Sequence, residues 1–441
     1  MRKLPIAIAM TLVLTASCAP AAAPTPTPVP GETAPAAVFR AAPIAAAAPL
    51  IAPAEESEAA ALVATGANDF AFRLSAALAR QAEGENLICS PFSVWLPLAA
   101  LANATDASHR DALMAALSAA GAGADDINAA ASRLLYSLTK EEAREYAEED
   151  YPDPLRIANA IFVASGVTLK QDFAQIFMDH YRGSVAGVDF TAPEAVEAVN
   201  RWAAEGTQGL ITEIIQEFDP DTVAALASAI YFSDRWFTEF DPALTAEGVF
   251  HAPGEETTAF YMTRDADLPY YEDDLIQALP LRFVTDGALY VLLPKDGDAT
   301  GLLESMTEEY FRKIQENSTL ATGKLLLPRF SLASDVIDLK ETLTALGVPL
   351  FDQAAAPLTG GLIEENIPVF LSDAVHKAVI EVDEKGTTAA AVTVMTARAT
   401  SMLLPSETFT MICDKPFVFI LCDRTRDGGE QVLFTGVVNR P

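Results

Sequence analysis

Basic residues are scarce in this chain of 441 residues. Lysine and arginine number 29 against 61 aspartates and glutamates, which leaves a formal net charge of −32. Nucleic acids and anionic membrane surfaces are bound through basic patches, so this balance argues against both as partners. The composition therefore favours a partner that is neither a nucleic acid nor an anionic membrane surface.

Cysteine and histidine are also rare. Beyond Cys18 only Cys89, Cys413 and Cys422 remain, and three cysteines cannot all pair, which excludes a disulfide framework. One disulfide bond and buried free thiols both remain open. No Cys-x-x-Cys pair is present and the four histidines are widely scattered, so we expect no metal site and no cofactor.

The first eighteen residues, Met1 to Cys18, have the pattern of a secretory signal. Arg2 and Lys3 precede an apolar run that is too short to anchor the chain stably across a bilayer. The small residues before Cys18 resemble a bacterial lipobox, in which that cysteine carries a lipid, although Thr15 stands where leucine is more usual. Ordinary signal cleavage is the alternative. We expect an exported protein, extracellular or at the cell surface, which contacts a membrane only through a lipid on Cys18.

Two further regions follow the signal. Residues 19–58 are rich in alanine, proline and threonine, a composition that cannot bury a core and predicts a disordered stalk. A disordered export leader with no role of its own is the alternative. Residues 59–441 contain no Pro/Gly-rich break and no internal repeat, which favours a single mixed domain.

An uncharged stretch near the C-terminus stands apart from the rest. From Gly386 to Ala397 most residues are small or β-branched, and as a strand they form two rows that could both be buried. These rows hold little apolar area with which to keep the segment in a core. We interpret it as exposed in one state and a strand in another; an ordinary buried strand is the alternative.

The residues before this stretch, Ser372 to Thr387, closely resemble the strand and hinge that lead into the reactive-centre loop of the serpins. Other segments resemble serpin strands and helices in the family's order: Asn86–Val94, Leu155–Val163, Val199–Trp202, Thr207–Ile211, Ala224–Phe240, Leu289–Pro294, Lys324–Phe330, Lys415–Leu421 and Val432–Asn439. The resemblance implies an α+β serpin fold. Such a fold has a large central β-sheet, two further sheets, a ring of helices and an exposed loop, here at about residues 384–405.

The resemblance also implies a region where strands of the central sheet part, formed by Ser90, Pro91, Ser93, Ser228, Trp236 and His376. Ser90 before Pro91 fits a helix cap followed by proline in the first turn. Ser228 stands where serpins usually carry asparagine, and Trp236 is also explained as a large core aromatic. A hydrolase using Ser90 and His376 lacks the Gly-x-Ser-x-Gly elbow, so we expect no enzyme.

Membership of this family implies a serine protease inhibitor that acts as a suicide substrate. The protease attacks the loop, forms an acyl-enzyme, and is trapped when the loop inserts into the central sheet. Insertion requires a hinge free of buried charge, and small residues there are typical of inhibitory members. The hinge residues are Glu384, Gly386, Thr387, Thr388, Ala389, Ala390 and Ala391. A non-inhibitory serpin, acting as a binding or carrier protein, is the alternative.

Counting from Gly386 as in the family places the reactive bond between Thr400 and Ser401. This small residue suggests an elastase-like or subtilisin-like target. The alternative bond, Arg398–Ala399, suits a trypsin-like protease, and a cysteine protease is a further candidate. We expect a monomer, and the acidic residues around Glu141 argue against a heparin-like cofactor.

Overall fold

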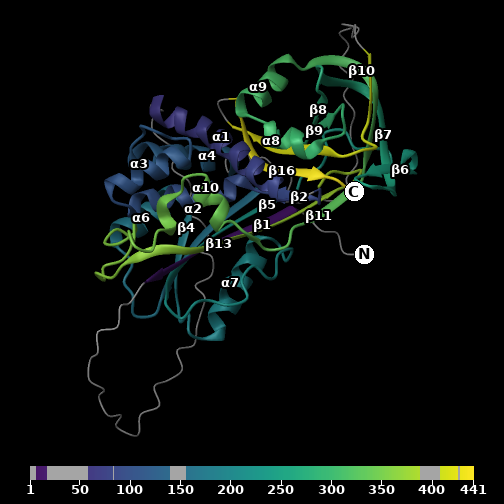
Figure 1. Ribbon diagram of the computed structural model, residues 1–441. Helices are drawn as coiled ribbons and strands as arrows, with labels where there is room; N and C mark the ends of the chain where they lie inside the picture. The colour runs from purple at the N-terminus through teal and green to yellow at the C-terminus, as the bar shows by residue number, and fades with distance from the viewer. Residues whose placement is uncertain (1–5, 17–57, 83, 140–154, 388–407, 426–427) are drawn as a thin grey trace.

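The computed structural model describes residues 6–16, 58–82, 84–139, 155–387, 408–425 and 428–441 (Figure 1). Within them, a central sheet of seven strands lies against a group of helices. Its neighbours in order are β11 (Phe330–Ala333), β13 (Val369–Val382), β1 (Ile6–Ala16), β5 (Thr222–Phe232), β3 (Leu155–Ala164) and β4 (Gly183–Val188), and β12 (Ile337–Asp338) also pairs with β13. All of these pairs are antiparallel except β3 with β4.

Strand β1 is the unexpected member of this sheet. The sequence places Ile6–Ala16 in a secretory signal outside the folded domain, whereas in the structure this segment is a strand between β5 and β13 (Figure 1). The physical reason is backbone hydrogen bonding. An apolar segment without charge can fill a gap between two strands, because both of its backbone edges then find donors and acceptors.

The remaining strands form two smaller sheets that share the long strand β7 (Glu255–Glu272). At its C-terminal end β7 joins β8 (Ile276–Arg282), β9 (Ala288–Pro294), β15 (Phe417–Arg424), β16 (Glu430–Val438) and β2 (Leu87–Cys89). Its earlier part pairs with β6 (Ala246–Ala252) and β10 (Thr319–Pro328), and β10 pairs in parallel with β14 (Thr408–Ile412). The predicted α+β fold with one large and two further sheets is therefore confirmed.

The helices of the described residues cover both faces of the central sheet. They are α1 (Glu58–Gln81), α2 (Pro91–Leu101), α3 (Ala107–Ala116), α4 (Ala124–Thr139), α6 (Gln171–Tyr181), α7 (Pro193–Gly206), α8 (Ala299–Ser305), α9 (Glu308–Asn317) and α10 (Lys340–Ala345), with single 3-10 turns at Ala102–Ala104, Pro242–Leu244 and Pro349–Phe351. Helix α1 begins at Glu58, the last residue of the predicted stalk. Gly347, with φ +92°, follows the end of α10.

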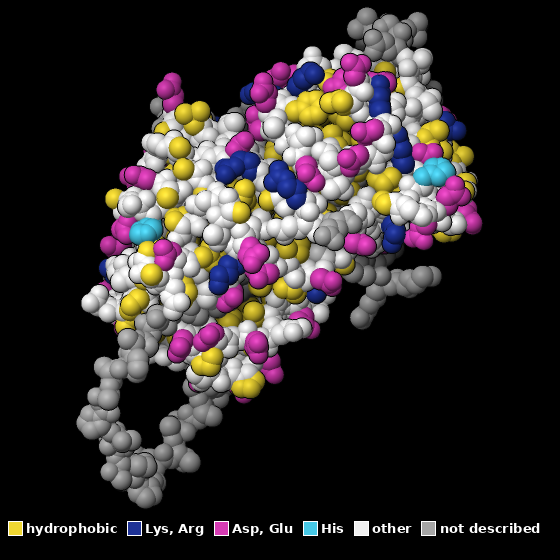
Figure 2. Space-filling model, viewed as in Figure 1, with side chains coloured by type: hydrophobic (Ala, Val, Ile, Leu, Met, Phe, Trp, Pro, Cys, Tyr) yellow, Lys and Arg dark blue, Asp and Glu magenta, His cyan; other side chains and the backbone are white. Residues whose placement is uncertain are grey.

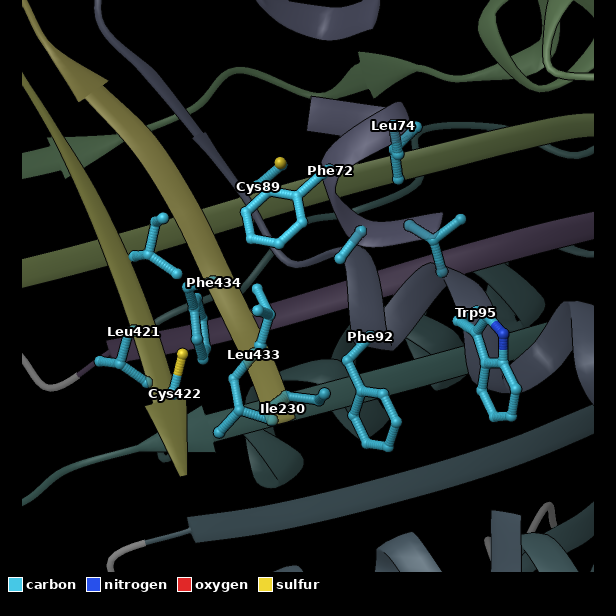
Figure 3. Packing of buried hydrophobic residues seen from close by; sticks show 14 of the residues in the cluster. Phe72, Leu74, Cys89, Phe92, Trp95, Ile230, Leu421, Cys422, Leu433 and Phe434 are labelled. Atoms are coloured by element: carbon cyan, nitrogen blue, oxygen red, sulfur yellow. The ribbon is translucent and has the colours of Figure 1, made fainter. Parts of the chain in front are cut away.

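The main core lies between the central sheet, the helices α1 and α2, and the strands β15 and β16 (Figure 3). Phe92 and Trp95 of α2 stack with ring centroids 6.1 Å apart, and Phe72 and Leu433 are buried nearby. Cys89, Cys413 and Cys422 are all buried free thiols in the structure. Burial raises the pKa of Cys89 to about 11, so this thiol stays protonated at neutral pH.

Helix α7 covers the opposite face of the central sheet through a second, smaller cluster that includes Trp202. Every residue of β5 is buried because this strand lies between the two clusters. Successive side chains of β5 point alternately into the two clusters, and Ala225, Ala227 and Ala229 belong to the cluster under α7. A Cβ on Gly206 of α7 would lie only 3.2 Å from the Cβ of Ala229, so the helix approaches too closely for larger residues.

Acidic side chains are spread over the visible face of the molecule, with fewer lysines and arginines between them (Figure 2). No helix among the described residues is both long and apolar enough to cross a membrane. The same residues contain no cluster of histidine, cysteine and carboxylate side chains that could hold a metal ion.

Candidate functional site at the hinge end of the central sheet

The chain turns sharply after β13, at Asp383–Thr387. Asp383 N–H donates to the carbonyl of Gly386 at 3.0 Å, and Gly386 N–H donates back to Asp383 at 3.3 Å. Gly386 has φ +134°, and a Cβ there would lie 2.2 Å from the carbonyl oxygen of Asp234. Only glycine fits this position, because any side chain would collide with backbone and strain the turn.

Thr387, the last described residue at the start of the uncharged stretch, is fixed against the chain that leaves β5. It is 1% exposed, and its N–H donates to the carbonyl of Asp234 at 2.8 Å. The N–H of Asp234 donates in return to Thr387 Oγ1, also at 2.8 Å. The antiparallel bridge between Gly386 and Arg235 continues the same alignment. The hinge therefore already lies beside the end of β5.

Trp236 holds the turn from the other side. Its indole Nε1–H donates to the carbonyl of Asp383 at 2.8 Å, and its backbone N–H donates to the carbonyl of Lys385 at 2.9 Å. The ring is buried and stacks on Phe283 with centroids 4.5 Å apart. Trp236 is therefore both a core aromatic and a clamp on the hinge backbone.

Glu384 is a buried carboxylate at the base of this turn, and Arg329 and Thr245 are its partners. Arg329 Nε donates to Glu384 Oε1 at 2.7 Å, and the hydroxyl of Thr245 donates to the same oxygen. Burial by itself raises the pKa of Glu384, but the hydrogen bonds from Arg329 and Thr245 outweigh it and lower the pKa below its usual value. Glu384 is therefore ionised at neutral pH and ties the hinge to β10 and β6 through their flanking residues.

A second group of polar residues lies halfway along the sheet, beneath α2. Ser90 caps α2, Pro91 is its first residue, and the hydroxyl of Ser93 donates to the carbonyl of Ser90 at 2.9 Å. The backbone N–H of Ser90 donates to Nε2 of His376 on β13 at 3.1 Å. Burial lowers the pKa of His376 to about 3, so its imidazole is neutral and accepts this hydrogen bond.

This arrangement is unsuited to a serine hydrolase. The hydroxyl of Ser90 donates to the carbonyl of Leu433 at 2.7 Å, and His376 faces the backbone N–H of Ser90 rather than its hydroxyl. Both side chains are fully buried. A nucleophile must be accessible and hydrogen-bonded to its base, so these two residues support the helix and the sheet instead.

Ser228 lies on β5 at the same level of the sheet as His376. In the register of the strands, Met10 of β1 is paired with Ser228 on one side and with His376 on the other. The structure thus brings Ser90, Ser93, Ser228 and His376 together in the middle of the sheet, while Trp236 lies apart at the hinge.

Several predicted site residues fall outside the described part of the chain. These are Cys18, the hinge residues Thr388, Ala389, Ala390 and Ala391, and both candidate reactive bonds, Thr400–Ser401 and Arg398–Ala399. Sequence reasoning in turn missed Asp234, Thr245 and Arg329. A usable signal exists for Arg329, which is a single charge directly after the apolar end of β10.

Comparison with known proteins agrees with this architecture. The family model described as Serpin (serine protease inhibitor) matches residues 65–441. Alpha-1-antiproteinase of Mus saxicola is 30% identical over 394 residues, which cover 88% of this chain and 91% of the relative. The chain belongs to the serpin family.

Solved structures share the fold of this chain. Human thyroxine-binding globulin has a TM-score of 0.72 at 23% identity, covering 87% of this chain and 99% of that one. Cleaved serpin 42Da has a TM-score of 0.73 at 24% identity, again covering 87% and 99%. At this identity these structures establish the fold alone.

Proposed function

We propose that this protein inhibits a serine protease as a suicide substrate, by inserting its cleaved loop between β5 and β13. The observation that carries the proposal is that a strand fits between β5 and β13, next to the hinge. That position holds an eleven-residue strand, β1, which is antiparallel to both neighbours. A chain that turns back after β13 through Gly386 would run in the same direction as β1.

The register of the hinge supports a particular alignment of the loop residues with β5. Thr387 lies opposite Asp234, and in an antiparallel pair each step forward on one strand is a step back on the other. Continued in register, Ala389 would lie opposite Phe232, and Ala391 opposite Ile230. Phe232 and Ile230 belong to the main core, so these loop residues would face it, as small uncharged residues can without a buried charge.

Insertion in this register gains a full strand of backbone hydrogen bonds, which is what would drive the trap. The loop from Gly386 to Thr400 would add about 50 Å of strand at roughly 3.3 Å per residue. The protease, joined to Thr400 through an acyl bond, would be carried to the far end of the sheet. Arg398–Ala399 remains the second candidate bond, for a trypsin-like protease.

The strand position between β5 and β13, which we call the slot, must be open for the loop to insert. In the structure it is occupied by Ile6–Ala16, the apolar part of the segment that the sequence assigns to a secretory signal. The inhibitor is therefore the exported protein after that signal has been removed. A lipid on Cys18 would hold it at a membrane surface outside the cytoplasm.

The experiment is to incubate the exported protein with elastase-like, subtilisin-like and trypsin-like serine proteases and with a papain-like cysteine protease. We expect a covalent complex that survives SDS with at least one of them, and mass spectrometry of the released C-terminal peptide identifies the bond. Nicking the loop with a protease that is not trapped should raise the unfolding temperature sharply. If no covalent complex forms and the unfolding temperature does not rise, the proposal is rejected.

A non-inhibitory carrier is the second candidate, favoured by a cavity of about 550 Å³ between α1, α9 and the turn that joins β15 to β16. Its lining includes four arginines and three glutamates, and Arg282 is paired with Glu430 and Arg312 with Glu308; the seven residues are Arg133, Arg282, Arg312, Arg424, Glu308, Glu316 and Glu430. Thyroxine-binding globulin, which shares the fold, was solved in complex with thyroxine. A carrier would be stabilised against heat by small organic anions and would form no complex with any protease.

A further inference from the structure

The N-terminal segment and the reactive loop compete for one position in the central sheet. Strand β1 pairs with β13 from Ala7 to Ala16 and with β5 from Ile6 to Thr15. This inference rests on the proposed function, in which the loop takes the same position. Ile6 lies opposite Phe232, and the inserted loop would place Ala389 opposite the same residue. Two chains cannot both hydrogen-bond to the facing edges of β5 and β13.

We propose that Ile6–Ala16 is an intramolecular lock: while it remains attached, it fills the slot, keeps the loop out of the sheet and leaves the precursor without inhibitory activity. Removal of the signal on export then opens the slot. Activation of the inhibitor would thus be coupled to its passage out of the cytoplasm, so that proteases inside the cell are spared.

The sequence of the segment matches the two faces of the slot. On β5 the main-core residues Phe232, Ile230 and Leu226 pair with Ile6, Ile8 and Leu12. The positions paired with Tyr231, Ala229, Ala227 and Ala225, which lie in the cluster under α7, carry Ala7, Ala9, Thr11 and Val13. By register, the residues paired with main-core positions are therefore larger than those paired with the cluster under α7. A membrane-directed signal has no need of this alternation.

The loop is the weaker occupant by the same comparison. Opposite the main-core residues of β5 it would bring Ala389, Ala391, Met395 and Ala397 where the segment has Ile6, Ile8, Leu12 and Leu14, so only Met395 matches its counterpart in size. Burial of apolar area scales with side-chain size, so the attached segment should outcompete the loop.

One feature of the slot favours the loop over the segment. Within the described residues, Oγ of Ser228 and Nδ1 of His376 have no hydrogen-bond partner, and both flank Met10. Thr393 of the loop would bring a hydroxyl to the same place, so the slot is fully satisfied only after the segment has gone.

The test uses the full chain, produced without export, in two forms. Ile8→Asp with Leu12→Asp would place two charges in the main core and should expel the segment without altering any residue of the hinge or loop. Ile8→Leu with Leu12→Ile is the matched control, because it keeps the apolar character. Both are compared with the unaltered chain for protease complex formation and for hydrogen exchange of residues 6–16.

We expect protected amides in residues 6–16 and little complex for the unaltered chain and the control. The charged variant should lose the protection and form at least about ten times more complex. Equal complex formation by all three forms would overturn the lock while leaving the proposed function intact. Fast exchange of residues 6–16 in the unaltered chain would overturn the lock whatever the protease result. No complex with any form, or with the exported protein, would overturn the proposed function and the lock as its regulator.

Discussion

Ser228 on β5 and His376 on β13 face each other across a single strand, and each presents a buried polar atom without a partner in the described residues. The intervening position belongs to Met10 in the structure. In the inserted register it would belong to Thr393, six residues beyond Thr387, as Ser228 is six residues before Asp234. Burying a polar atom unpaired is costly, so a hydroxyl placed between the two should favour insertion.

Thr393→Val should therefore weaken the trap while keeping the shape of the loop. A hydroxyl that pairs with a buried partner contributes about 1 kcal/mol, which corresponds to a roughly fivefold shift from complex toward hydrolysed loop. The measurement is the number of inhibitor molecules consumed per trapped protease. Thr396→Val is the control, because its position would lie opposite Ala225, where no unpaired polar atom is found among the described residues. An equal effect of the two substitutions would contradict the assigned register.

Thr387→Arg should convert the exported inhibitor into a substrate. Thr387 is buried and bonded to Asp234 at the start of the slot, so an arginine would have to enter the sheet as an unpaired charge or remain outside. We expect SDS-resistant complex to fall by at least about tenfold while loop cleavage continues. Thr387→Ser, which keeps the hydroxyl, should retain most of the complex. Undiminished complex with the arginine variant would refute the role of the hinge.

Glu384→Gln should loosen the hinge end of the sheet. The substitution removes the charge that accepts hydrogen bonds from Arg329 and Thr245, and hydrogen bonds to a buried charged group contribute about 1.5–3 kcal/mol. We expect a lower unfolding temperature in a thermal scan. Glu364→Gln, at an exposed carboxylate, should leave it unchanged. An unchanged unfolding temperature for Glu384→Gln would show that the ion pair is not needed to hold the turn.

Acid should destabilise the folded protein through His376. Its pKa is about 3 when folded and near 6.5 when unfolded, so between these values the unfolded chain binds one more proton. The stabilising contribution is complete above about pH 6.5 and is lost as the pH falls toward 3, by up to about 1.4 kcal/mol per pH unit.

The measurement is the unfolding temperature between pH 7.5 and pH 4 for the unaltered protein and for His376→Gln. The glutamine keeps an acceptor for the N–H of Ser90 but does not titrate. Its stability should fall less steeply with acid than that of the unaltered protein. Parallel curves would mean that His376 is not buried in its neutral form.

Much of the fold could be predicted from local pattern. The strands at Leu155–Val163 and Leu289–Pro294, the cap at Ser90 and the end of α10 at Gly347 all follow from apolar runs, capping residues and glycine. The hinge was also foreseeable, because Gly386 and Thr387 stand at the boundary between a charged strand and an uncharged stretch. Their contacts were not, since Asp234 is 153 residues away from Thr387 in the chain.

The amino-acid sequence by itself determined the class of fold, and it predicts where the reactive-centre loop lies and that its small uncharged residues suit entry into a sheet. Only the tertiary structure decided which segment lies in the sheet. Backbone donors and acceptors are alike in every residue, so an open strand position accepts any uncharged segment whose large and small side chains match its two faces. Ile6–Ala16 meets that condition, and no local pattern could have shown where its two neighbours, β5 and β13, would be.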